Sequence, residues 1–104
     1  MRDFKLNKSV KCADGFSMSV QANQGAYCSP RVSNAEQYTE VEVGYPSHEE
    51  PLLLNWADEP DRPTDTVYGY VPSQTVALVI AKHGGMVEGQ VPAGVAELKA
   101  VSHK

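Results

Sequence analysis

The sequence predicts an α+β domain in which a three- to four-stranded antiparallel sheet carries one main helix packed on one face. Two observations predict the sheet: residues 16–22 and 38–45 alternate apolar and polar side chains, which is the period of a half-buried strand. A third predicts the helix, because residues 75–83 place apolar side chains at helical spacing. The chain has 104 residues, the length of a single domain.

The first predicted strand, residues 16–22, is followed by Asn23-Gln24-Gly25, in which glycine suits a tight hairpin loop. We therefore expect residues 26–29 to return beside the first strand and to end at Pro30, which cannot donate to a ladder. Residues 1–13, which precede this hairpin, are expected to form a flexible arm.

The second strand, residues 38–45, and the third, residues 66–71, complete the predicted sheet. Their alternation divides the side chains between two faces. The face toward the helix should carry Phe16, Met18, Val20, Val41, Val43, Tyr45, Val67 and Val71, with Gly69 letting the helix approach. The opposite face should show Ser17, Ser19, Gln21, Glu40, Glu42, Tyr68 and Tyr70. Such a face fits a recognition surface rich in tyrosine, and equally an ordinary solvated face.

Residues 46–65 are predicted to form a long acidic loop, because four prolines in twenty residues exclude a long helix or a central strand. Inside this loop, residues 51–56 form an apolar cluster that ends at Trp56. The favoured interpretation is an anchor that pins the loop to the domain. The alternative is an exposed binding hot spot.

The helix is expected to begin near Ser73 as N-cap and to end before Gly84 at the C′ position. Its buried face should contain Val76, Val79 and Ile80. Residues 90–104 are expected to be a weakly structured tail, in which residues 92–101 could form a short final helix.

The charge is strongly segregated along the chain. Nine of its thirteen acidic residues lie between Glu36 and Asp65, where Arg62 is the only arginine or lysine, so this segment has a net charge of −8. The sequence pI near 5.2 argues against nucleic acid or an anionic membrane as the main partner, because both require a positive surface. No apolar run approaches the length that crosses a bilayer, and a cytoplasmic location is expected.

No motif for a cofactor or a metal stands out. The possible metal ligands Cys12, Cys28, His48, His83 and His103 lack the close pairing of zinc sites. The two cysteines are expected to be free thiols, because the predicted hairpin separates them by about 27 Å, whereas the Cα atoms of a disulfide lie within about 7 Å. Cys28 precedes Arg31 by three residues, and a nearby cation can activate a thiol.

The segments 14–22, 27–31, 38–45 and 65–71, followed by His83-Gly84-Gly85, resemble small accessory proteins encoded by bacteriophages and prophages. The resemblance covers residues 14–85, and such proteins have no assigned active residues to transfer. It implies a protein that binds and modulates or inhibits a host enzyme or defence complex in the host cytoplasm.

Together these observations predict a non-enzymatic binding protein, a monomer or a homodimer, that uses an acidic surface against a basic surface of a protein partner. Two alternatives are a small enzyme that uses Cys28 and a structural module that oligomerises through a strand edge. The residues predicted to bind are Glu40, Glu42, Glu49, Glu50, Trp56, Asp58, Glu59, Asp61, Tyr68 and Tyr70.

Overall fold

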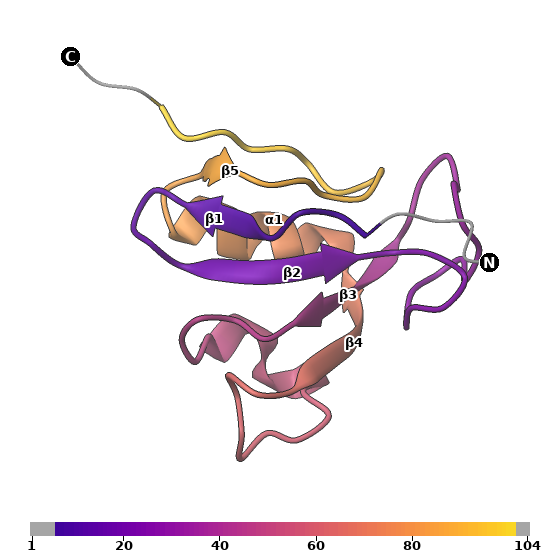
Figure 1. The fold of residues 1–104 in the computed structure, drawn as a ribbon, viewed down its shortest axis with the longest axis horizontal. Helices are drawn as coiled ribbons and strands as arrows, with labels where there is room; N and C mark the ends of the chain where they lie inside the picture. Colours follow the sequence, from indigo (N-terminus) through magenta and orange to yellow (C-terminus); the bar gives the residue numbers. More distant parts are fainter. Residues whose placement is uncertain (1–5, 102–104) are drawn as a thin grey trace.

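Five antiparallel strands form one sheet in the order β4-β3-β2-β1-β5, and the helix α1 lies across one face of it (Figure 1). The structure is a computed structural model and describes residues 6–101. Its elements are β1 Val10–Cys12, β2 Ser17–Gln21, β3 Glu40–Gly44, the 3-10 helix η1 Pro51–Trp56, β4 Val67–Pro72, α1 Ser73–Lys82 and β5 Met86–Glu88. The predicted α+β class is confirmed, with more strands than the three or four expected.

The alternation in β2 and β3 does select the buried face. Six side chains that were predicted to face the helix are buried: Phe16, Met18, Val20, Val41, Val43 and Val71. Tyr45 is an exception, because it follows the end of β3, takes a positive φ of 48° and is 59% exposed. The polar residues of β2 and β3 on the other face are half-buried.

The predicted hairpin of residues 16–29 is wrong. Strand β2 pairs on one side with β1, through Val10 and Met18, and on the other with β3, through Val20 and Val43. Both edges of β2 are therefore occupied by strands whose valines are fully buried. In residues 26–29 only an isolated bridge remains, which joins Ser29 to Glu40 of β3. Residues 10–12, expected in a flexible arm, instead form β1.

Strand β4 contains a β-bulge that reverses the predicted faces of its tyrosines. Val71 pairs with Val41, but Tyr68 pairs with Val43, so two residues of β4 lie opposite the single residue Glu42. This extra residue shifts the alternation by one position. Tyr68 is consequently fully buried, against the prediction that it lies on the polar face. Tyr70, with φ of 55°, remains on the surface and is 42% exposed.

Helix α1 follows β4 directly and packs Val76, Val79 and Ile80 into the core, as predicted. Ser73 is the first helical residue and not the N-cap; its hydroxyl donates to the carbonyl of Tyr38. The helix ends as predicted, with Gly84 at a positive φ of 93°. The amides of Gly84 and Gly85 donate to the carbonyls of Ala81 and Ile80, which is the hydrogen-bond pattern of a Schellman motif.

Residues 89–101, the described part of the chain after β5, contain neither the short helix predicted for residues 92–101 nor a further strand. They lie beside β5 instead, where the amide of Met86 donates to Leu98 and the amide of Ala100 donates to Met86 (Figure 1). The outer edge of β5 is thus covered by the chain itself. Within residues 6–101, no helix combines the length and the apolar character that crossing a bilayer requires.

Candidate functional site

A groove lies along the outer edge of β4, the other border of the sheet. Two segments cover this edge: the amide of Asp58 donates to the carbonyl of Val67, and the amide of Tyr70 donates to the carbonyl of Tyr27. Between them the edge is open, and the opening has a volume of about 330 Å³. We call it the β4-edge groove; its lining consists of Tyr27, Trp56, Ala57, Asp58, Val67, Gly69 and Tyr70.

Three aromatic side chains line the β4-edge groove. The rings of Tyr27 and Tyr70 have centroids 6.0 Å apart and are inclined by 38°. Trp56, the last residue of η1, is half-buried and packs against the core, while Leu53 in the same helix is fully buried. Leu53 therefore anchors the loop, in agreement with the favoured interpretation of this cluster. Trp56 contributes to the groove as well as to the packing.

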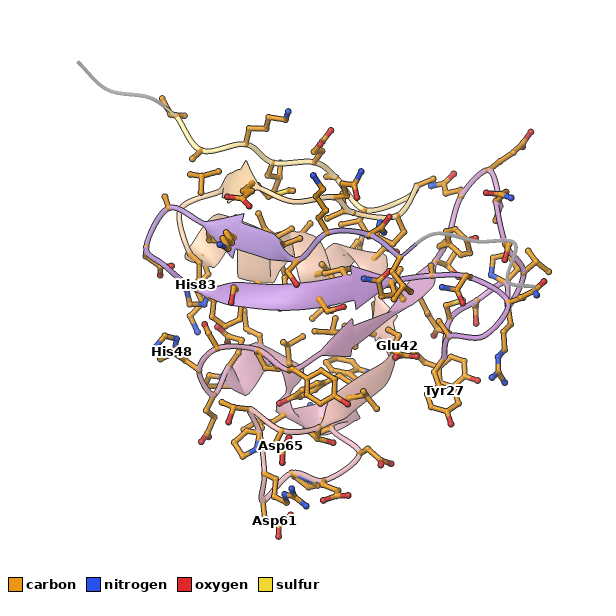
Figure 2. The ribbon with its side chains drawn as sticks, in the orientation of Figure 1. Tyr27, Glu42, His48, Asp61, Asp65 and His83 are labelled. Atoms are coloured by element: carbon orange, nitrogen blue, oxygen red, sulfur yellow. The ribbon has the colours of Figure 1, made fainter. Side chains whose placement is uncertain are left out.

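Two glutamates of β3 hold the segment that carries Tyr27. The Oε1 atom of Glu42 accepts a hydrogen bond from the amide of Tyr27 at 2.8 Å, and the Oε1 atom of Glu40 accepts one from the hydroxyl of Ser29 at 2.8 Å. Figure 2 shows Glu42 beside Tyr27, next to the sheet. These carboxylates, predicted to face a partner, are thus partly used to position the groove.

Residues 57–66 follow η1 and begin at the groove; from here on, the name acidic loop refers to these residues alone. They carry four acidic residues against Arg62, a net charge of −3. Arg62 forms ion pairs with Glu59 and Asp65 within the loop. Asp58 and Asp61 have no ion-pair partner among residues 6–101. The buried Tyr68 holds the loop against the sheet, because its hydroxyl donates to the carbonyl of Pro63 at 2.5 Å. Figure 2 places Asp61 and Asp65 on this loop, away from the body of the sheet.

A second cluster of ionisable groups surrounds His83 at the end of α1, and Figure 2 shows His83 on the opposite side of the view from Tyr27. The Nε2 atom of His83 lies 2.6 Å from the Oε1 atom of Glu50, and its Nδ1 atom lies 2.6 Å from the Oδ2 atom of Asp14. The Nζ atom of Lys82 donates to the other oxygen of Glu50 at 2.9 Å. The imidazole also stacks on the ring of Phe16, with centroids 4.1 Å apart.

The hydrogen bonds and charges in this cluster shift the pKa values of His83 and Glu50. Burial works to lower the pKa of His83, but its hydrogen bonds to Glu50 and Asp14 outweigh burial, so the pKa is raised. For Glu50, burial alone would raise the pKa; the bonds from Lys82, the amide of Leu52 and His83 together lower it. Both imidazole nitrogens face carboxylates, so neither is left to act as a base. The cluster therefore ties α1, η1 and the β1–β2 turn together, and it does not resemble an acid–base centre.

The two cysteine side chains lie in the interior of the fold. Cys12 and Cys28 are free thiols, as predicted, and both are buried. Burial raises the pKa of Cys28, and this effect outweighs the nearby Arg31 guanidinium, which lowers it. No group of three or more His, Cys, Asp and Glu within residues 6–101 is arranged to hold a metal ion. His103, a possible ligand from the sequence, lies outside the described residues.

The structure brings together only part of the predicted binding set. Trp56, Asp58 and Tyr70 line one groove, Glu42 supports it, and Glu59 and Asp61 lie on the adjoining acidic loop. Glu40 holds Ser29, and Glu49 is exposed in the loop before η1. Glu50 and Tyr68, with exposures of 1% and 0%, are too deeply buried to meet a partner.

Four groove residues were not among the predicted binding residues: Tyr27, Ala57, Val67 and Gly69. Gly69 was expected to face the helix, but a Cβ atom there would lie 3.2 Å from the Cβ atom of Tyr27. The glycine therefore makes room for the tyrosine. No local pattern marks this contact, because it joins residues more than forty positions apart. No family model matches the chain, and searches of curated proteins and of solved structures find no similar protein.

Proposed function

We propose that this chain is a non-catalytic binding protein that engages a protein partner through the β4-edge groove and the adjoining acidic loop. The observation that carries the proposal is the meeting of Trp56, Asp58 and Tyr70 in one groove, at the start of a loop with a net charge of −3. Large aromatic side chains provide most of the binding energy in many interfaces, and rim charges set orientation and association rate.

The partner should present a basic surface. Asp58 and Asp61 lack an ion-pair partner among the described residues, so a cation from outside can approach both without displacing one. The resemblance of residues 14–85 to phage-encoded accessory proteins suggests that this partner is a bacterial host or defence protein. The buried thiols and the fully occupied imidazole of His83 favour binding over the alternative of an enzyme that uses Cys28.

The sheet edges also bear on the alternative of a module that oligomerises through a strand edge. Residues 57–58 and Tyr27 cover most of the β4 edge, and residues 98–100 cover β5. A second chain would have to displace these segments before it could add a strand. Covered edges are a common means of preventing such pairing.

The test is affinity capture from bacterial lysate, with the wild-type chain and with a variant carrying Asp58→Asn, Asp61→Asn and Tyr70→Ala. Exposed charges are screened beyond about 10 Å at 0.1 M salt, so raising the salt from about 50 to about 500 mM should release the partner. A control variant with Glu36→Gln and Glu97→Gln changes the net charge equally at distant exposed sites. Equal capture by wild type and the groove variant, retained at high salt, would refute the proposal.

A further inference from the structure

The size of the β4-edge groove limits what it can hold. Pockets for small molecules and cofactors commonly have volumes of about 300–1,000 Å³. At about 330 Å³, this groove is at the lower end of that range. It is also open at the edge of a sheet, and its floor includes Gly69, which has no side chain. These dimensions suit one long side chain of a polypeptide that runs across the edge.

The walls favour a cation in the groove. Tyr27, Trp56 and Tyr70 present aromatic rings, and the faces of such rings attract ammonium and guanidinium groups within about 6 Å. One such contact already exists within the chain, because the guanidinium carbon of Arg31 lies 5.2 Å from the centre of the Tyr27 ring. The Tyr27 ring thus already accepts one planar cation within the chain.

The charges at the rim distinguish a guanidinium from an apolar group. Asp58 lines the groove, is exposed and has no ion-pair partner within residues 6–101. Its backbone is fixed on β4 by the bond to Val67. The positive charge of Arg31 opposes an incoming cation. The negative charge of Glu42, which is bonded to the amide of Tyr27, offsets it, so the negative charge of Asp58 remains uncompensated.

The backbone at Tyr70 gives a further reason to regard the groove as a binding site. Its φ of 55° lies in the left-handed region, which is rare for a bulky residue and costs on the order of 1 kcal/mol or more. The bulge that requires this conformation also keeps the ring on the surface beside Tyr27. The position of the Tyr70 ring is therefore set by strand β4 before any ligand arrives.

We propose that the β4-edge groove binds one arginine side chain of an extended segment of the partner. This inference rests on the proposed function. The guanidinium stacks against the aromatic walls, and its N–H groups donate to the carboxylate of Asp58. Arginine suits this arrangement better than lysine, because its planar group can stack and form two parallel hydrogen bonds at once, and it is less strongly hydrated.

The chain has a single tryptophan, so the fluorescence of Trp56 reports directly on the groove. The folded chain would be titrated with the peptide acetyl-Gly-Ser-Arg-Ser-Gly-amide and with matched peptides carrying lysine or citrulline in place of arginine. We expect a saturable change with the arginine peptide, and affinities lower by about tenfold or more for the other two. Asp58→Asn should weaken arginine binding by about tenfold. Glu36→Gln, an equal charge change at an exposed site outside the groove and the acidic loop, should leave it within about twofold.

Equal affinities for the arginine and lysine peptides, or equal losses in the two variants, would overturn the arginine site and leave a general electrostatic surface. Tight binding of a matched peptide with proline at its centre would also overturn it, because aromatic grooves bind proline-rich segments by shape. If no peptide binds but the salt-sensitive capture of a partner persists, the arginine site fails and the proposed function stands. Loss of that capture as well would refute both.

Discussion

The Nε2 atom of His83 and the Oε1 atom of Glu50 lie 2.6 Å apart, although 33 residues separate them in the chain. Glu50 also accepts from the amide of Leu52, so it caps the first turn of η1 and holds the end of α1 at the same time. Because Asp14 faces the other nitrogen of His83, the imidazole satisfies both carboxylates only when it is protonated. The stability of this fold should therefore depend on pH.

The pH dependence has a predictable form. The folded-state pKa of His83 is raised, so its contribution is complete below its ordinary pKa of 6.5 and is lost as pH rises through the folded value. The pKa of Glu50 is lowered, so its contribution is complete above its ordinary value of 4.5 and is lost as pH falls. Urea unfolding from pH 3 to pH 9 should show maximal stability between about 4.5 and 6.5. A flat profile for His83→Gln above pH 6 would confirm the assignment, and an unchanged alkaline loss would contradict it.

Replacing Glu50 should destabilise the fold more than replacing its neighbour. Glu50→Gln removes a buried charge that faces both Lys82 and His83, and we expect a loss of about 2 kcal/mol in the free energy of unfolding. Lys82 is partly exposed and can be rehydrated, which limits the cost. Glu49→Gln makes the same chemical change at an exposed position and should stay within about 0.5 kcal/mol. Equal effects in chemical denaturation would show that the buried pairs contribute little.

The hydroxyl of Tyr68 should control the order of the acidic loop. Tyr68→Phe leaves the carbonyl of Pro63 without this partner, and we expect a loss of about 1 kcal/mol with little change in the core. Amide hydrogen exchange should become faster in residues 57–66, while β2 and β3 keep their protection. Unchanged exchange in the loop would mean that the loop is held by its other contacts, such as the bond from the amide of Asp58 to Val67.

Gly69→Ala should narrow the β4-edge groove. The new Cβ atom would lie 3.2 Å from the Cβ atom of Tyr27, so Tyr27 must shift or the strand must bend, at a cost of about 1 kcal/mol. Partner capture and the Trp56 fluorescence response should both weaken. Gly44→Ala is the matched control, since its Cβ atom would meet Ser19 at an ordinary 3.7 Å. Equal partner binding by the two variants would show that Gly69 is not required for the function of the groove.

The thiols should react slowly in the folded chain. Both are buried, and burial raises the pKa of Cys12 and of Cys28, so the reactive thiolate is scarce at neutral pH. Alkylation by iodoacetamide at pH 7 should be slower by about tenfold or more than in the urea-unfolded chain. Mass spectrometry identifies the modified residue. Faster reaction of Cys28 in the folded state would revive the alternative of a cysteine-dependent enzyme.

Periodicity predicted those elements whose side chains obey it over five or more residues. Strand β2 and helix α1 have such patterns, and their buried faces follow them. Strands β1 and β5 escaped prediction because each has three residues, too few for an alternation to stand out. The false hairpin of residues 16–29 followed from a plausible turn at Gly25. Turn chemistry alone cannot show that β1 and β3 already occupy both edges of β2.

The sequence by itself determined the fold class, the helix with its glycine terminator and the concentration of acidic charge between Glu36 and Asp65. Only the tertiary structure decided which of those acids and aromatics face outward. A bulge opposite Glu42 buries Tyr68 and leaves Tyr70 on the surface, and the cations at the end of α1 draw Glu50 into the interior. Both outcomes depend on partners distant in the chain, whereas a local pattern records only the side chains within one element.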